Sequence, residues 1–218
     1  EMAEAAREMG YAYIAVTDHS KHVTVTGGLD EKRLMEQIEE IDSVGARLKG
    51  ITVLKGIEVD ILEDGTLDLS DDALKELDLV IGSVHSSFSL SAEKQTGRIL
   101  RAMDNQYFTI LGHPSGRLIN EREPYSADME QIIRAAADRG CFLELNAHPE
   151  RLDLTDTYCK AAKEAGVKLA ISTDAHSITD LELMRFGVGQ ARRGWLEAAD
   201  VINTRSLKEL RKLLRSRR

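Results

Sequence analysis

The chain has 218 residues, of which 42% are hydrophobic and 30% charged, and its formal net charge at pH 7 is -8. This charge excludes a generally basic surface, so a nucleic acid would have to be held by local patches or by bound metal ions. No apolar run approaches the roughly 20 residues of a membrane span, and two cysteines are too few for a disulfide framework. We therefore expect a cytoplasmic protein with no membrane partner.

Short apolar runs alternate with longer amphipathic segments, beginning with a helix over residues 1–9 that Gly10 ends. No capping residue or strand precedes this helix, so we expect a single domain, residues 1–218, that is truncated at its N-terminus. Later helices are expected over residues 31–48, 71–77, 92–103, 128–139 and 156–165, and strands over residues 12–17, 52–59, 79–84, 108–112, 141–146, 169–173 and 200–203. Strands that are apolar on both faces, such as "LVIGSV", are typical of a parallel sheet covered by helices. This order favours a (β/α) barrel, with an open sheet as the alternative.

Polar side chains occur where the predicted strands end. In chain order they are Asp18 and His19, Glu58, His85, His113, His148, and Asp174 with His176. The C-terminal ends of parallel barrel strands meet on one face, so these groups are expected to share one pocket. Imidazoles with bridging carboxylates suit zinc, manganese or iron, whereas calcium and magnesium sites are nearly all oxygen. A single histidine at a strand end is more often a hydrogen-bonding residue than a ligand, but the combined set favours a multinuclear hydrolytic site.

Six motifs carry a family resemblance: "TDHS", "GIEVD", "SVHSSF", "GHPSGRLI", "ELNAHPERLDL" and "STDAHS". Together they resemble the polymerase-and-histidinol-phosphatase (PHP) family, and more narrowly the C-terminal PHP domain of bacterial family-X DNA polymerases. The resemblance implies an α/β fold, a distorted (β/α)7 barrel, with up to three divalent ions (Mn2+, Zn2+ or Fe2+) that serve phosphoester hydrolysis. For the polymerase-linked branch it implies Mn2+-dependent 3'-5' exonuclease action on DNA 3' ends in DNA repair, with a covalently linked N-terminal polymerase domain.

The family's metal ligands correspond to six positions of this chain. By resemblance they are Glu58 as the bridge between two ions, His85 and His113 at the second ion, Asp174 at the first, and His19 and His176 at the third. Asp18 would lie behind these ligands and orient His19 or a bound water, with a turn-forming role as the alternative.

The chain departs from the family pattern at its start. The family begins with a strand that ends in His-x-His, and no His-x-His occurs here. The resemblance therefore implies a barrel that lacks its first strand, in which one full metal site is retained, and a domain less stable and less active than the intact one. Two alternatives stay open: a small-molecule phosphatase of the histidinol-phosphatase type acting on a small phosphate ester, and a catalytically impaired PHP scaffold.

Groups beyond the ligands are candidates for substrate contact. Arg117 and Arg151 can hold phosphate oxygens in fork geometry, and an ordinary surface role is the alternative for each. His148 is a candidate general acid or phosphate contact. The basic segment from Lys208 predicts an amphipathic helix, which is more typical of a solvated covering helix than of a DNA contact. Its inward positions are Leu207, Leu210, Leu213 and Leu214.

Overall fold

A computed structural model describes residues 1–22 and 27–215. Six strands form one sheet in the order β1-β2-β3-β4-β5-β6, and every neighbouring pair is parallel. The strands are β1 (Tyr13–Val16), β2 (Thr52–Asp60), β3 (Leu79–Ser83), β4 (Ile110–Leu111), β5 (Phe142–Asn146) and β6 (Leu169–Ser172). A helix lies between each strand and the next, as parallel pairing requires. The predicted α/β fold with a parallel sheet is confirmed.

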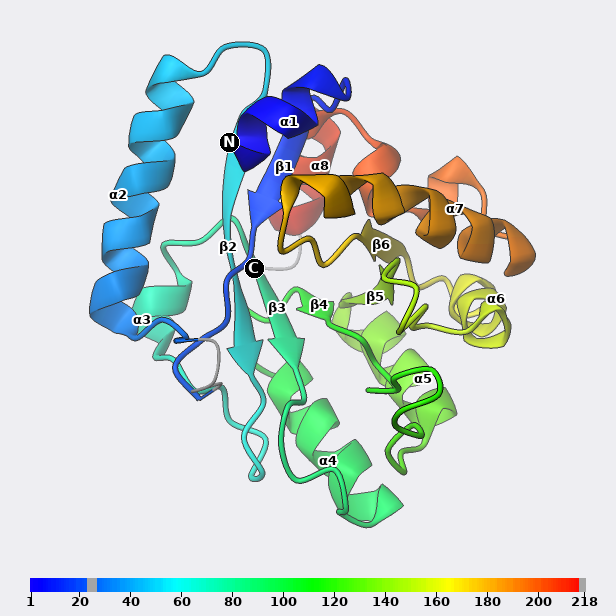
Figure 1. Ribbon diagram of the computed structural model, residues 1–218. Coiled ribbons are helices and arrows are strands. Elements are labelled where there is room, and N and C mark those ends of the chain that lie inside the picture. The colour runs from blue at the N-terminus through cyan, green and yellow to red at the C-terminus, as the bar shows by residue number, and fades with distance from the viewer. Residues whose placement is uncertain (23–26, 216–218) are drawn as a thin grey trace.

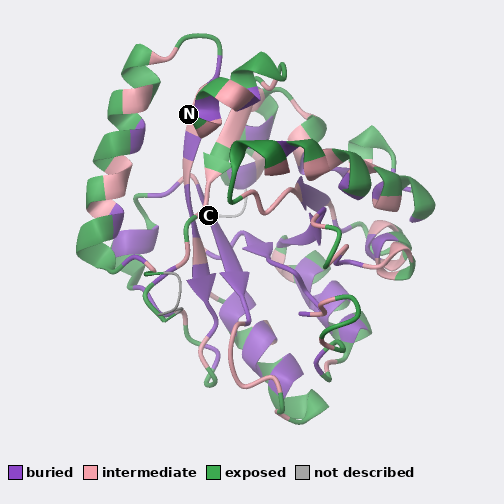
Figure 2. Ribbon diagram, in the orientation of Figure 1, coloured by how far each residue is buried: buried purple, intermediate pink, exposed green. Residues whose placement is uncertain are grey.

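The sheet curls into a half-barrel with helices around its outer side (Figure 1). The α-helices are α1 (Met2–Glu8), α2 (Glu31–Arg47), α3 (Asp71–Leu74), α4 (Ala92–Met103), α5 (Met129–Arg139), α6 (Asp156–Glu164), α7 (Met184–Arg193) and α8 (Leu207–Arg215); 3-10 turns are η2 (Ile178–Leu183), η3 (Ala198–Asp200) and η4 (Ile202–Thr204). Figure 2 shows that the central strands β3 and β5 are buried along their whole length. Among the described residues, no helix combines the length and the apolar character needed to cross a membrane.

Local capping explains where most helices begin. At five N-caps the side-chain oxygen accepts a hydrogen bond from the backbone N–H three residues later; the caps are Asp30, Ser70, Ser91, Asp128 and Thr155. Each such cap contributes about 1 kcal/mol by satisfying a backbone donor that the helix itself leaves free. Gly10 follows α1 with φ of 87°, which confirms the predicted end of the first helix.

Hydrophobic residues pack on both sides of the sheet. On the outer side one cluster lies beneath α4 to α7 and a second beneath α2 and α3. On the inner side, Leu54, Ile81 and Ile110 pack with Leu210 and Leu214 of α8. The predicted inward face of the C-terminal helix is therefore confirmed, and this helix covers the concave face of the sheet.

The strand predicted over residues 200–203 is wrong. Only a single parallel bridge joins Val201 to Leu169, between the short turns η3 and η4. The Asn203 side chain explains why no seventh strand forms here. Its Oδ1 accepts from Ile171 N at 3.1 Å, and its Nδ2 donates to Ile171 O at 2.8 Å. A side-chain amide thus takes the hydrogen bonds that a seventh strand would have made.

Helix α7 was not expected from the sequence. Its segment contains Gly187 and Gly189, and glycine costs about 1 kcal/mol relative to alanine inside a helix. Gly187 allows close packing on the sheet, because a Cβ there would lie 2.5 Å from Ile171 Cγ2 and 2.7 Å from Ala147 Cβ. Tertiary packing therefore outweighs local propensity in this segment.

Candidate metal centre

Four side chains from four different strand ends meet at one point. Glu58 lies within β2, while His19, His85 and His113 lie two or three residues beyond β1, β3 and β4. Glu58 Oε1 is 2.9 Å from His113 Nε2 and 3.3 Å from His85 Nε2. Its other oxygen, Oε2, is 3.5 Å from His19 Nδ1. The convergence predicted from the strand ends is present for these four residues.

The donor atoms of this cluster have the spacing of metal ligands. His85 Nε2 and His113 Nε2 are 3.2 Å apart, and one ligand atom each from His19, Glu58 and His85 lies within 4.8 Å of the others. Zinc–nitrogen bonds of about 2.0–2.1 Å in a tetrahedral site separate two ligand atoms by about 3.3 Å. His19 Nδ1 is also buried without a hydrogen-bond partner. The residues present therefore fit a divalent ion bound by imidazole and carboxylate.

Charge coupling within the cluster shifts its pKa values. Burial opposes the charge of Glu58, but hydrogen bonds from His113 and His85 outweigh it and hold the pKa of this carboxyl well below its usual range. Burial also opposes a charge on His85, yet the carboxylates of Asp60 and Glu58 raise its pKa to about 9. Burial lowers the pKa of His19, against the attraction of Glu58. A proton on His85 therefore balances Glu58 when no metal is bound.

The loop after β4 holds His113 from two sides. His113 has φ of 24°, and its backbone N–H donates to Glu144 Oε2 at 2.5 Å. The buried Asp153 carboxylate accepts from the backbone N–H groups of Ser115 at 3.0 Å and Gly116 at 2.9 Å. These contacts fix an unfavourable backbone conformation, and with it the direction of the His113 ring.

Asp174 and His176 lie beside the four-residue cluster. Asp174 has φ of 52°, and its Oδ2 accepts from Asn146 Nδ2 at 3.1 Å. His176 Nδ1 is 2.8 Å from Asp174 O, its side chain is 71% exposed, and its ring centroid is 6.5 Å from that of His19. The structure therefore brings both residues to the same end of the sheet, with His176 facing solvent.

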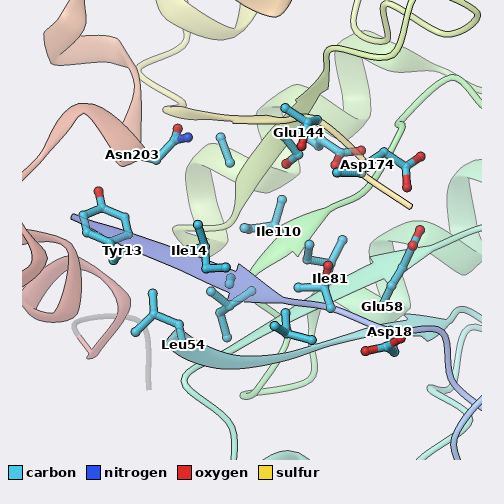
Figure 3. Close-up of a pocket in the computed structure, with 18 of the residues that line it drawn as sticks. Tyr13, Ile14, Asp18, Leu54, Glu58, Ile81, Ile110, Glu144, Asp174 and Asn203 are labelled. Atoms are coloured by element: carbon cyan, nitrogen blue, oxygen red, sulfur yellow. The ribbon is translucent and has the colours of Figure 1, made fainter. Parts of the chain in front are cut away.

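A cavity of about 760 Å³ runs along the concave side of the sheet, next to the cluster. Figure 3 shows Glu58, Glu144 and Asp174 at one end of this cavity and Tyr13 and Asn203 at the other. The walls between them are apolar. Within the described residues β1 and β6 do not pair with each other, so the cavity lies where the curled sheet remains open.

The two candidate phosphate-binding arginines differ in what their guanidinium groups contact. Arg117 donates from Nε to Arg151 O at 2.8 Å and from Nη2 to Leu152 O at 2.5 Å, so it joins two loops. Arg151 Nε lies 3.4 Å from Asp174 Oδ2, and its Nη1 is buried without a hydrogen-bond partner. Of the two, Arg151 is the one that lies beside Asp174, whereas Arg117 donates to backbone carbonyls of the neighbouring loop.

The two candidate catalytic residues lie outside the cluster. Asp18 Oδ2 accepts from Gln37 Nε2 of α2 at 2.5 Å, so its side chain is bound to the helix and the structure shows no hydrogen bond between it and His19. His148 Nδ1 accepts from the Glu150 backbone N–H at 3.4 Å, and a third of its side chain is exposed. Both lie near the same end of the sheet, and their catalytic roles stay predictions.

Two buried acids were not assigned a role from the sequence. Glu144 lies in β5, where burial raises its pKa to about 7 despite the attraction of His113. Asp60 ends β2, is fully buried and contacts His85. A signal for both exists in the sequence, because a carboxylate within an apolar strand is rarely buried without a specific partner. The sequence does not show which partner each one has.

Comparison with known proteins decides the family. The sequence matches the PHP domain over residues 1–148. The chain belongs to the PHP family. This PHP domain is 46% identical, over 215 residues, to the DNA polymerase/3'-5' exonuclease PolX of Bacillus subtilis; the match covers 99% of the chain and 38% of that relative. A probable phosphatase of Thermoanaerobacter is 35% identical over 197 residues, which is 83% of the chain and 73% of the relative.

A solved structure confirms the fold of the PHP domain. Histidinol phosphate phosphatase from Lactococcus lactis, crystallised with zinc, L-histidinol and phosphate, superposes with a TM-score of 0.62 over 90% of this chain and 87% of that one, at 16% identity. The phosphatase and polymerase relatives together support a phosphoesterase. The chain spans less than half the length of its PolX relative.

Proposed function

We propose that this PHP domain is a divalent-metal phosphoesterase that hydrolyses phosphodiester bonds at DNA 3' ends, as a Mn2+-dependent 3'-5' exonuclease in DNA repair. The observation that supports it best is the cluster of Glu58 with three histidines, in a chain 46% identical to a DNA polymerase/3'-5' exonuclease. A covalently linked polymerase domain, as that relative's name indicates, would deliver the DNA end. Zn2+ and Fe2+ are the other candidate ions for this donor set.

In this proposal the side chains mainly hold the metal ions and orient the phosphate group. By the resemblance, His85 and His113 would hold one ion together with Glu58, and Asp174 would hold a second that shares Glu58. His19 and His176 would hold a third. Bound ions of this kind lower the pKa of a coordinated water and offset the charge on phosphate oxygens. Arg151, whose Nη1 has no hydrogen-bond partner, would donate to a nonbridging phosphate oxygen beside Asp174. Arg117 would act through the loops that it joins.

A second candidate is hydrolysis of a small phosphate monoester. The observation that favours it is the 35% identity to a probable phosphatase of which the chain covers 73%. The two reactions share a metal centre and differ in the size of the substrate. They are therefore separated by substrate preference and not by metal dependence.

One experiment tests both candidates. Single-stranded DNA labelled at its 5' end and histidinol phosphate are each incubated with the chain and Mn2+, with Glu58→Gln as the matched inactive control. A ladder of shortened products that the control does not give supports the exonuclease. Rapid monoester hydrolysis without a ladder supports the second candidate, and no Glu58-dependent hydrolysis of either substrate would reject the proposed function.

A further inference from the structure

The fully buried carboxylate of Asp60 contacts His85 twice. Asp60 Oδ1 accepts the backbone N–H of His85 at 3.2 Å and faces the ring atom Nδ1 of the same residue at 3.1 Å. Through the opposite ring nitrogen, Nε2, His85 faces Glu58 and His113. One imidazole thus has a buried carboxylate behind it and the proposed metal ligands in front.

The Asp60 backbone is fixed from two neighbouring segments. Its N–H donates to Ser20 Oγ at 2.9 Å and Asp68 Oδ1 at 3.1 Å, and Asp68 N donates back to its carbonyl at 3.2 Å. The side chain has little freedom, because none of its surface is exposed and Oδ2 lies 3.5 Å from His22 Nε2. The backbone of Asp60 is therefore held by segments other than that of His85, and its buried carboxylate is held against His85.

Arg98 of α4 ties the two strand ends together. Its guanidinium is buried and donates to the carbonyl of Ile61, which follows Asp60, and to the carbonyl of Ser86, which follows His85. It also brings a positive charge near the Asp60 carboxylate. Burying a carboxylate without a nearby positive charge would be costly. The Arg98 guanidinium provides such a charge beside Asp60.

We propose that Asp60 is a positioning residue, which holds the proton on His85 Nδ1 and so leaves the Nε2 lone pair directed at the metal. This role rests on the proposed function, because it concerns the same centre. A histidine that binds metal needs one nitrogen without a proton, and the hydrogen bond at its other nitrogen decides which one that is. Without Asp60, His85 can present either nitrogen and can rotate its ring.

The test measures Zn2+ affinity of the metal-free chain by competition with a chelator. Asp60→Ala should weaken binding about 10- to 100-fold. Asp60→Asn should stay within a few-fold of wild type, because a neutral Oδ1 still accepts from both His85 donors. Asp78→Asn is the control: it removes a half-buried carboxylate that precedes β3, at the opposite end of the strand from His85, and it should leave the affinity unchanged.

A second readout follows the proton directly. In the Zn2+-loaded, 15N-histidine-labelled chain, NMR should show His85 with a proton on Nδ1 and metal on Nε2. The reverse pattern in wild type would overturn the proposal even if Asp60→Ala failed to fold. Wild-type affinity in a folded Asp60→Ala chain would overturn it as well, whereas absence of any Zn2+ binding by wild type would reject the proposed function itself.

Discussion

The protonation of His85 makes the stability of the metal-free chain depend on pH. Burial opposes its charge, but Asp60 and Glu58 raise its pKa from the ordinary 6.5 to about 9. Because the pKa of His85 is higher in the folded chain than in the unfolded chain, protonation of His85 contributes fully to the free energy of unfolding below pH 6.5. This contribution is lost as the pH rises through 9. At about 1.4 kcal/mol per pH unit, the loss between pH 6.5 and 9 amounts to about 3 kcal/mol.

The assay is urea unfolding of the chelator-treated chain at pH 6.5, 7.5, 8.5 and 9. We expect the free energy of unfolding to fall by about 3 kcal/mol more in wild type than in His85→Gln across this range, because the variant has no proton to lose at this position. Saturating Zn2+ should also remove the dependence, because a bound imidazole is already neutral. A wild-type free energy that is constant from pH 6.5 to 9, or that rises, would refute the coupling of His85 to the two carboxylates.

Three further changes test particular contacts. Burial raises the pKa of Glu144 to about 7, so wild type should lose about 3 kcal/mol relative to Glu144→Gln as the pH rises from 4.5 through 7, measured by urea unfolding. Gly82→Ala should destabilise the chain by about 1–3 kcal/mol in the same assay, because its Cβ would overlap the Phe108 ring, which would have to shift. Arg117→Ala should lower the unfolding free energy by about 2 kcal/mol through two lost bonds to carbonyls, and Arg117→Lys should not restore it.

Each of these changes has its own control. For Gly82 the chain offers Gly97 in α4, where a Cβ would meet nothing within 4 Å, so Gly97→Ala should stabilise by up to about 1 kcal/mol. A Gly82→Ala chain as stable as wild type would contradict the close contact with Phe108. Equal pH profiles of Glu144→Gln and wild type would show that folding does not raise the pKa of Glu144. Unchanged stability of Arg117→Ala would contradict a structural role for its two bonds to carbonyls, and Arg117 would then remain a candidate for binding phosphate.

Local features of the sequence determined much of the fold. Asp30 and Ser91 act as helix caps through hydrogen bonds that span three residues, and Gly10 ends the first helix through its own backbone freedom. The positions of His85 and His113 at strand ends followed from apolar runs of a few residues. These features were predictable because the interactions that cause them lie within one turn or one strand.

Contacts between distant segments were decided only by the tertiary structure. The Asn203 side chain replaces a strand by bonding to Ile171, 32 residues away, and Asp60 reaches His85 across 25 residues. Neither pairing leaves a periodic pattern in the sequence, because it depends on which strands become neighbours. The sequence therefore determined which side chains are available at the strand ends, and the curl of the parallel sheet decided which of them meet around Glu58.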